Sequence, residues 1–125
     1  MTHPALTLAA LLLAGCSLFG DDCDDLTDQL DRLDARLEAE IGEAQASSEA
    51  ACRAVPVGDK ACGGPEEYLV YSIEMSDPER VEGLAAEHRR VGDARNQACE
   101  LASDCGFVTE PDVALVGGRC VAAPF

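Results

Sequence analysis

The residues most able to do chemistry in this 125-residue chain are its seven cysteines. They are Cys16, Cys23, Cys52, Cys62, Cys99, Cys105 and Cys120. No two of them form a Cys-x-x-Cys pair, and the chain has only two histidines, so the usual ligand spacings of zinc are missing. We therefore predict no metal-binding residue and no cofactor, and we expect the cysteines to be cross-linked or modified.

Catalytic motifs give no signal in this sequence. There is no Gly-x-Ser-x-Gly string, no phosphate-binding glycine loop and no metal-hydrolase helix motif. His88 falls on the apolar side of a predicted helix, where a hydrogen-bonded structural histidine is typical. Glu66 and Glu67 are adjacent at the start of a predicted strand, so their side chains should point to opposite faces. We expect no catalytic residue and no enzyme.

An uncharged apolar run near the start, residues 5–14, ends in Leu13-Ala14-Gly15-Cys16. It is shorter than the ~20 residues that a membrane-spanning helix needs, and it suits the core of a secretory signal. The tetrapeptide resembles the lipobox of bacterial lipoprotein signal peptides. That resemblance implies cleavage between Gly15 and Cys16 and a diacylglycerol on the Cys16 sulfur.

The same resemblance predicts where the protein is kept. Many Gram-negative lipoproteins that stay in the inner membrane carry Asp after the lipidated cysteine, whereas this chain has Ser17. We therefore expect a lipid-anchored protein of the cell envelope, at the outer membrane rather than the inner. Residues 1–15 would be the signal peptide and residues 16–21 a lipidated tether.

Charge narrows the choice of partners. The chain has 24 Asp and Glu against 9 Lys and Arg, a formal net charge of −15. Binding to nucleic acid depends on Lys and Arg that neutralise phosphates, so nucleic acid is excluded as a partner. We expect contact with a membrane through the lipid anchor and with an envelope protein, and the oligomeric state stays open.

Apolar spacing predicts an acidic amphipathic helix over residues 22–54. Its stripe repeats about every 3.6 residues and consists of Leu26, Leu30, Leu33, Leu37, Ile41, Ala44, Ser48 and Ala51. Pro56 should end the helix, and residues 55–65 should form a loop. The acidic residues of the first turns fit the positive end of the helix dipole.

The remainder, residues 55–125, reads as a disulfide-stapled core that packs with the helix as one domain. Residues 68–73 suit a covered strand, and Asp77-Pro78 suits the start of a second helix. Gly117-Gly118 joins two short apolar runs and predicts a C-terminal β-hairpin. The predicted fold class is α+β, made of a long N-terminal helix, a strand, a second helix and the hairpin.

The six cysteines after Cys16 are an even number in an exported chain, which predicts three disulfides and no free thiol. Sequence alone does not choose among the fifteen connectivities. Pairs that close short loops would be Cys52 with Cys62 and Cys105 with Cys120.

A second resemblance covers about residues 52 to 120. The string Ala-Cys-Gly-Gly-Pro-Glu-Glu-Tyr-Leu-Val-Tyr-Ser, residues 61–72, resembles a motif of short uncharacterised bacterial exported proteins and lipoproteins. Those proteins share a four-cysteine pattern and bring no known activity. Cys23 and Cys99 lie outside that pattern, so the resemblance implies that they pair with each other.

Two binding roles follow. The first is a structural or interaction domain held at the envelope. The alternative is a protease-inhibitor-like binder, in which the 55–65 loop displays Lys60, the only lysine, beside Val57. An enzyme of unknown type is a second alternative.

We also expect the first helix to lead away from the membrane, with the Lys60 loop at its far end. The alternative is a tether that flexes freely and gives the domain no preferred orientation.

Overall fold

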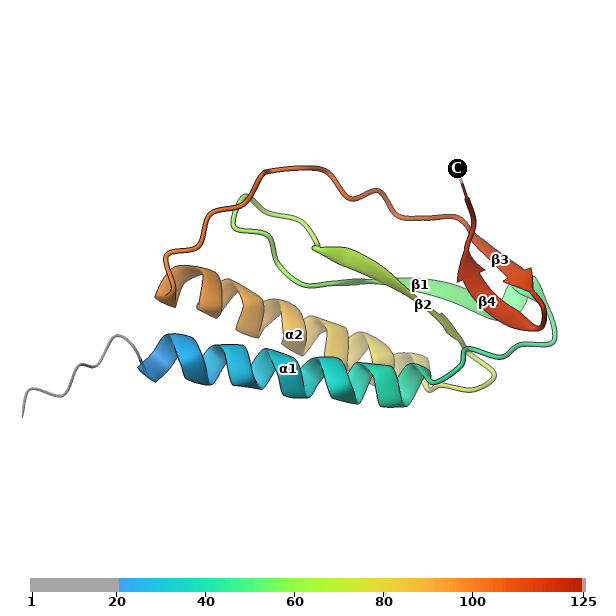
Figure 1. Ribbon diagram of the computed structural model, residues 1–125. Helices are drawn as coiled ribbons and strands as arrows, with labels where there is room; N and C mark the ends of the chain where they lie inside the picture. Colours follow the sequence, from blue (N-terminus) through green and yellow to red (C-terminus); the bar gives the residue numbers. More distant parts are fainter. Residues whose placement is uncertain (1–20, 125) are drawn as a thin grey trace, which may run out of the picture.

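The computed structural model describes residues 21–124 and shows an α+β domain of two helices and two antiparallel hairpins (Figure 1). The predicted fold class is confirmed. The signal peptide, Cys16 and most of the tether lie outside the described residues. No helix among residues 21–124 is both long enough and apolar enough to cross a membrane.

The first helix, α1, spans Asp21–Ile41 and buries its stripe from Leu30 to Ile41, with Leu37 completely covered. It ends where Gly42 takes φ +55° and its N–H bonds to the carbonyl of Glu38 at 2.9 Å. Glycine adopts this left-handed conformation without steric cost, so it is the usual residue just past a helix. The prediction of one helix over residues 22–54 is therefore wrong beyond residue 41.

The rest of that stretch turns back on itself. A short 3-10 helix, η1, spans Glu49–Ala51, and strand β1 spans Cys52–Val57. Ala44 and Ala51 are buried as the stripe predicted, but they are buried in a turn and in η1. Small residues at helical spacing do not distinguish a continued helix from the turn, η1 and β1 that the chain forms here.

Strand β2, Glu67–Ser72, matches the predicted strand closely and pairs with β1 in antiparallel register. Ile73 donates its N–H to the carbonyl of Ala51 at 3.0 Å, so the hydrogen-bonded pairs of this ladder are those between odd-numbered residues. By the alternation of antiparallel pairs, Pro56 opposite Tyr68 occupies a position where no N–H is needed. A proline within β1 is therefore compatible with the strand.

The second helix, α2, spans Pro78–Ala98 and packs antiparallel against α1 (Figure 1). It starts as predicted, because Asp77 caps it by accepting a hydrogen bond from the N–H of Glu79 at 3.0 Å. Val81, Leu84 and Ala85 face the stripe of α1 and the sheet.

The predicted C-terminal hairpin is confirmed as β3, Val113–Val116, and β4, Arg119–Ala122. Gly117 and Gly118 have φ +59° and +76°, the two positive angles that a type I′ hairpin turn requires. The N–H of Cys120 bonds to the carbonyl of Ala44 at 2.9 Å, so β4 also borders the segment after α1.

Three disulfides join the six described cysteines, as predicted, but the pairing differs. Cys23–Cys99 is confirmed. The short-loop pairs are wrong, because the structure has Cys52–Cys120 and Cys62–Cys105. Each bond joins a residue before β2 to one after α2, so the disulfides cross-link the two halves of the chain instead of closing local loops.

Candidate functional site

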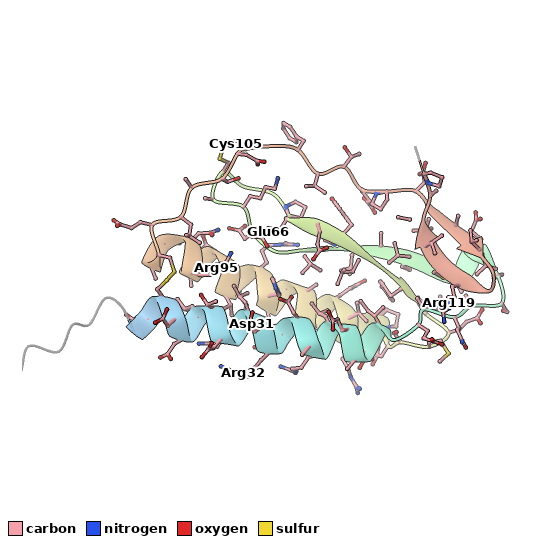
Figure 2. The ribbon with its side chains drawn as sticks, viewed as in Figure 1. Asp31, Arg32, Glu66, Arg95, Cys105 and Arg119 are labelled. Carbon is pink, nitrogen blue, oxygen red and sulfur yellow. A yellow bond between two sulfur atoms is a disulfide. The ribbon has the colours of Figure 1, made fainter. Side chains whose placement is uncertain are left out.

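A long connection without regular secondary structure, residues 99–112, runs from α2 to β3 (Figures 1 and 2). We call it the strap. It passes the 58–66 loop between β1 and β2, and Cys62–Cys105 ties the two together. Both cysteines of this bond are exposed, whereas Cys52 and Cys120 are buried. The strap is thus held to the rest of the domain at Cys99 and again at Cys105.

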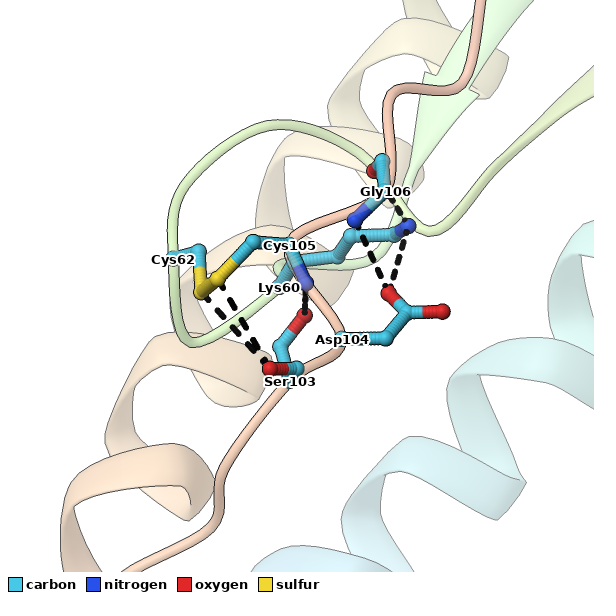
Figure 3. A network of polar contacts seen from close by, with 6 residues as sticks. All are labelled: Lys60, Cys62, Ser103, Asp104, Cys105 and Gly106. Atoms are coloured by element: carbon cyan, nitrogen blue, oxygen red, sulfur yellow. Dashed lines mark hydrogen bonds and ion pairs between the residues drawn. A yellow bond between two sulfur atoms is a disulfide. The ribbon is translucent and has the colours of Figure 1, made fainter.

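Lys60 joins the 58–66 loop to the strap beside the Cys62–Cys105 bond, and we call this contact region the junction (Figure 3). Its Nζ donates to the carbonyl oxygen of Gly106 at 2.6 Å and lies 3.6 Å from Oδ1 of Asp104. Its side chain is only 16% exposed. The one lysine of the chain therefore holds the strap in place.

Asp104 completes the junction through its own backbone turn. Its Oδ1 accepts a hydrogen bond from the N–H of Gly106 at 3.0 Å. That bond, followed by the charge of Lys60, lowers the pKa of the Asp104 carboxyl below its usual value. The ionised carboxylate is therefore the form that fits the folded strap.

This geometry does not fit a displayed binding loop at Val57 and Lys60. Val57 belongs to β1 and is 2% exposed. Lys60 is engaged by the strap and is not free to enter the pocket of a trypsin-like protease. Val57 and Lys60 are therefore not displayed as exposed side chains, because the sheet buries the valine and the strap covers the lysine. That the loop binds a protease stays a prediction.

Beside the junction lies a pocket of about 320 Å³ that sequence reasoning missed. In it, Nη2 of Arg95 lies 3.4 Å from Oε1 of Glu66, and Nδ2 of Asn96 donates to the carbonyl of Asp59 at 2.7 Å. These contacts join α2 to the 58–66 loop, while the Nε of Arg95 is buried without a hydrogen-bond partner. No cluster of three metal-ligating side chains occurs among the described residues.

The other face of Cys62–Cys105 opens on a hollow of about 540 Å³ lined by both loop and strap. Phe107 lines it and is completely exposed, an unusual state for a large aromatic residue. Gly63, Gly64 and Pro65 form the opposite wall.

His88 is buried between the helices, at 5% exposure, as its position on the apolar face predicted. Its Nε2 lies 2.8 Å from Oδ1 of Asp34 on α1, and its Nδ1 is buried without a hydrogen-bond partner. A histidine that acts as a general base must offer a nitrogen to a substrate. Here the nitrogen not bound to Asp34 faces the interior, so the pair serves as a polar link between helices.

The direction of β1 places the 58–66 loop at the N-terminal end of α1 (Figure 1). Asn96 contacts Asp59 and lies one turn before Cys99, which is bonded to Cys23 near the start of α1. The expectation that the Lys60 loop lies at the far end of the first helix is therefore wrong. The far end is formed by the turn after β2 and the turn of the β3–β4 hairpin.

No protein-family model, curated protein or solved structure matches the chain. Sequence reasoning found the cysteines and considered Glu66, but it missed Asp59 and Asn96 and did not place Glu66 beside Arg95. These four residues come together because β1 runs back along α2. The one usable signal is the string Ser103-Asp104-Cys105-Gly106, which has the composition of a turn and whose aspartate holds Lys60.

Proposed function

We propose that this protein is a lipid-anchored interaction domain of the bacterial cell envelope, directed to the outer membrane. The observation that carries the proposal is the Leu13-Ala14-Gly15-Cys16 string directly after an uncharged apolar run. A cysteine thiol is the nucleophile that acylation needs, and the small residues before it give a peptidase access to the bond. Two acyl chains on Cys16 would make anchoring stable.

The disulfides support this location. Disulfides persist in exported proteins and are rare in the reducing cytosol. Three of them stabilise a described domain of about one hundred residues, in which the strap and the 58–66 loop have no regular secondary structure. An oxidising compartment is the environment in which such a domain keeps its shape.

Binding rather than catalysis is the proposed activity. His88 presents no free nitrogen at the surface, and in the Arg95 pocket the guanidinium contacts Glu66 and Asp59 is bonded by Asn96. The exposed Phe107 and the two-stranded β1–β2 sheet, in which β2 has no second partner strand, supply surface for binding.

The test is metabolic labelling with a clickable fatty acid in a Gram-negative host, followed by membrane fractionation. We expect the wild-type chain to be labelled and to co-fractionate with the outer membrane. Cys16→Ala should abolish labelling and leave an unprocessed precursor. Cys23→Ala with Cys99→Ala, which removes a disulfide and leaves the proposed acylation site, is the matched control and should still be labelled.

Ser17→Asp tests the destination separately, because it should move the labelled protein to the inner-membrane fraction. Crosslinking in the envelope followed by mass spectrometry would then identify the protein it contacts. Unchanged fatty-acid labelling of Cys16→Ala would contradict the proposed anchor.

A further inference from the structure

The outer edge of β2 carries backbone groups that nothing in the described domain bonds. The bond from Ile73 N–H to Ala51 O shows that odd-numbered residues of β2 face β1 in the ladder. The N–H and C=O groups of Tyr68 and Val70 therefore point away from β1. β2 has no second partner strand, and no hydrogen bond to these four groups occurs among residues 21–124.

The outer edges of β1 and β4 are protected. β1 has Pro56 on its outer edge, a residue that blocks strand addition because it has no N–H. β4 is bordered by the segment at Ala44 to Ala46, which bonds to it. β2 has no proline, no lysine and no bulge between Tyr68 and Tyr71, so it lacks these three devices against edge pairing.

The N-terminal half of this edge is accessible. Glu67 is exposed, and Tyr68, Leu69 and Val70 are partly exposed, whereas Tyr71 and Ser72 are buried. The four unpaired groups all belong to this accessible half. Tyrosine, leucine and valine also suit a strand that gains a neighbour, because aromatic and β-branched side chains pack well across strands.

Charge identifies the class of partner. Glu67 is exposed at the start of the edge and forms no ion pair among the described residues, and the chain carries a net charge of −15. An acidic surface favours basic segments and repels a second copy of the same chain. The partly exposed ring of Tyr68 can also accept a lysine or arginine side chain over its face.

We propose that the edge of β2 from Glu67 to Val70 binds an extended basic peptide segment of a partner protein as an added strand. Backbone bonds to Tyr68 and Val70 would supply affinity, and the acidic surroundings would supply selectivity. The inference rests on the proposed function as an interaction domain and names its binding edge.

The experiment is an NMR titration of the purified, oxidised, ¹⁵N-labelled chain with the peptide acetyl-Lys-Val-Lys-Val-Lys-amide. The Tyr68 and Val70 amides should exchange quickly in the free protein and become protected on binding. The Leu69 and Tyr71 amides, bonded to β1, should be protected throughout. The same peptide with Glu for Lys, and one with N-methylated backbone amides, should each bind at least about tenfold more weakly.

Val70→Pro removes one outward N–H without removing a bond to β1, and it should weaken binding about tenfold. Its matched control is Ala54→Pro, at the cross-strand partner of Val70 but on the opposite edge of the sheet. If Val70→Pro does not fold, the exchange pattern of the unmodified chain decides. Protection elsewhere, equal binding of the Glu peptide, or concentration-dependent protection without peptide would each overturn the proposal. The outcome is independent of Cys16, because lipidation plays no part in the titration.

Discussion

The Nε2 atom of His88 lies 2.8 Å from Oδ1 of Asp34 and joins α2 to α1. The imidazole is buried, and its other nitrogen has no hydrogen-bond partner. The contribution of His88 to stability therefore comes from packing and from this one bond. We predict that His88→Ala lowers the free energy of unfolding by about 2–3 kcal/mol, measured by urea denaturation. Arg89→Ala, at the next and exposed position, should change it by less than about 0.5 kcal/mol. Equal losses in the two variants would contradict this role.

A second prediction concerns the order in which the disulfides are reduced. Cys62 and Cys105 are exposed and join two loops, whereas Cys52 and Cys120 are 2% and 6% exposed. A thiol reductant must reach a sulfur atom, so Cys62–Cys105 should be reduced first and Cys52–Cys120 last. Alkylation during a reductant titration, followed by peptide mass spectrometry, gives the order. Early reduction of Cys52–Cys120 would show that access does not control it.

Removing that exposed bond should also cost stability. Cys62 and Cys105 are 43 residues apart, and constraining the unfolded chain over such a loop contributes about 4 kcal/mol. The double variant Cys62→Ser with Cys105→Ser should therefore unfold at lower denaturant concentration. Hydrogen exchange should quicken in the strap before it quickens in α1.

The sequence was informative where a local signal was sufficient. Asp77-Pro78 defined the start of α2, and Gly117-Gly118 defined the hairpin turn, because capping and turn chemistry depend on neighbouring residues. The leucine stripe defined α1 up to Ile41 for the same reason.

The features that failed depend on residues far apart. Whether Ala44 and Ala51 continue a helix or line a turn is decided by β1 returning to pair with β2. Once β1 was missed, Cys52 could not be placed beside Cys120, nor the Lys60 loop beside α2. The sequence therefore predicted that the cysteines form disulfides, but it did not predict which residues of the candidate site lie next to each other.

The strap should respond to acid through Asp104. The N–H of Gly106 and the charge of Lys60 lower the pKa of this carboxyl in the folded protein. A group with a lowered folded pKa stabilises the fold above its unfolded pKa of about 3.9, and that contribution is lost as pH falls through the folded pKa. Asp104→Asn should therefore flatten the fall of stability below about pH 4. Asp112→Asn, in the same strap, removes one carboxylate without removing a contact with Lys60 or Gly106 and is the matched control.

The last prediction concerns Gly58, at the end of β1 with φ +82°. A Cβ added there would lie 2.7 Å from the Cβ and Cγ of Glu66, whereas one added at Gly42, φ +55°, would meet open space. Both substitutions incur the cost of a left-handed conformation, but only Gly58→Ala adds a clash. We expect Gly42→Ala to destabilise by about 1 kcal/mol and Gly58→Ala by about 2–3 kcal/mol in urea unfolding. Adding Glu66→Gly should remove the clash, so the double variant should lose less than the sum of the two single losses. Additive losses would mean that Glu66 does not pack on Gly58.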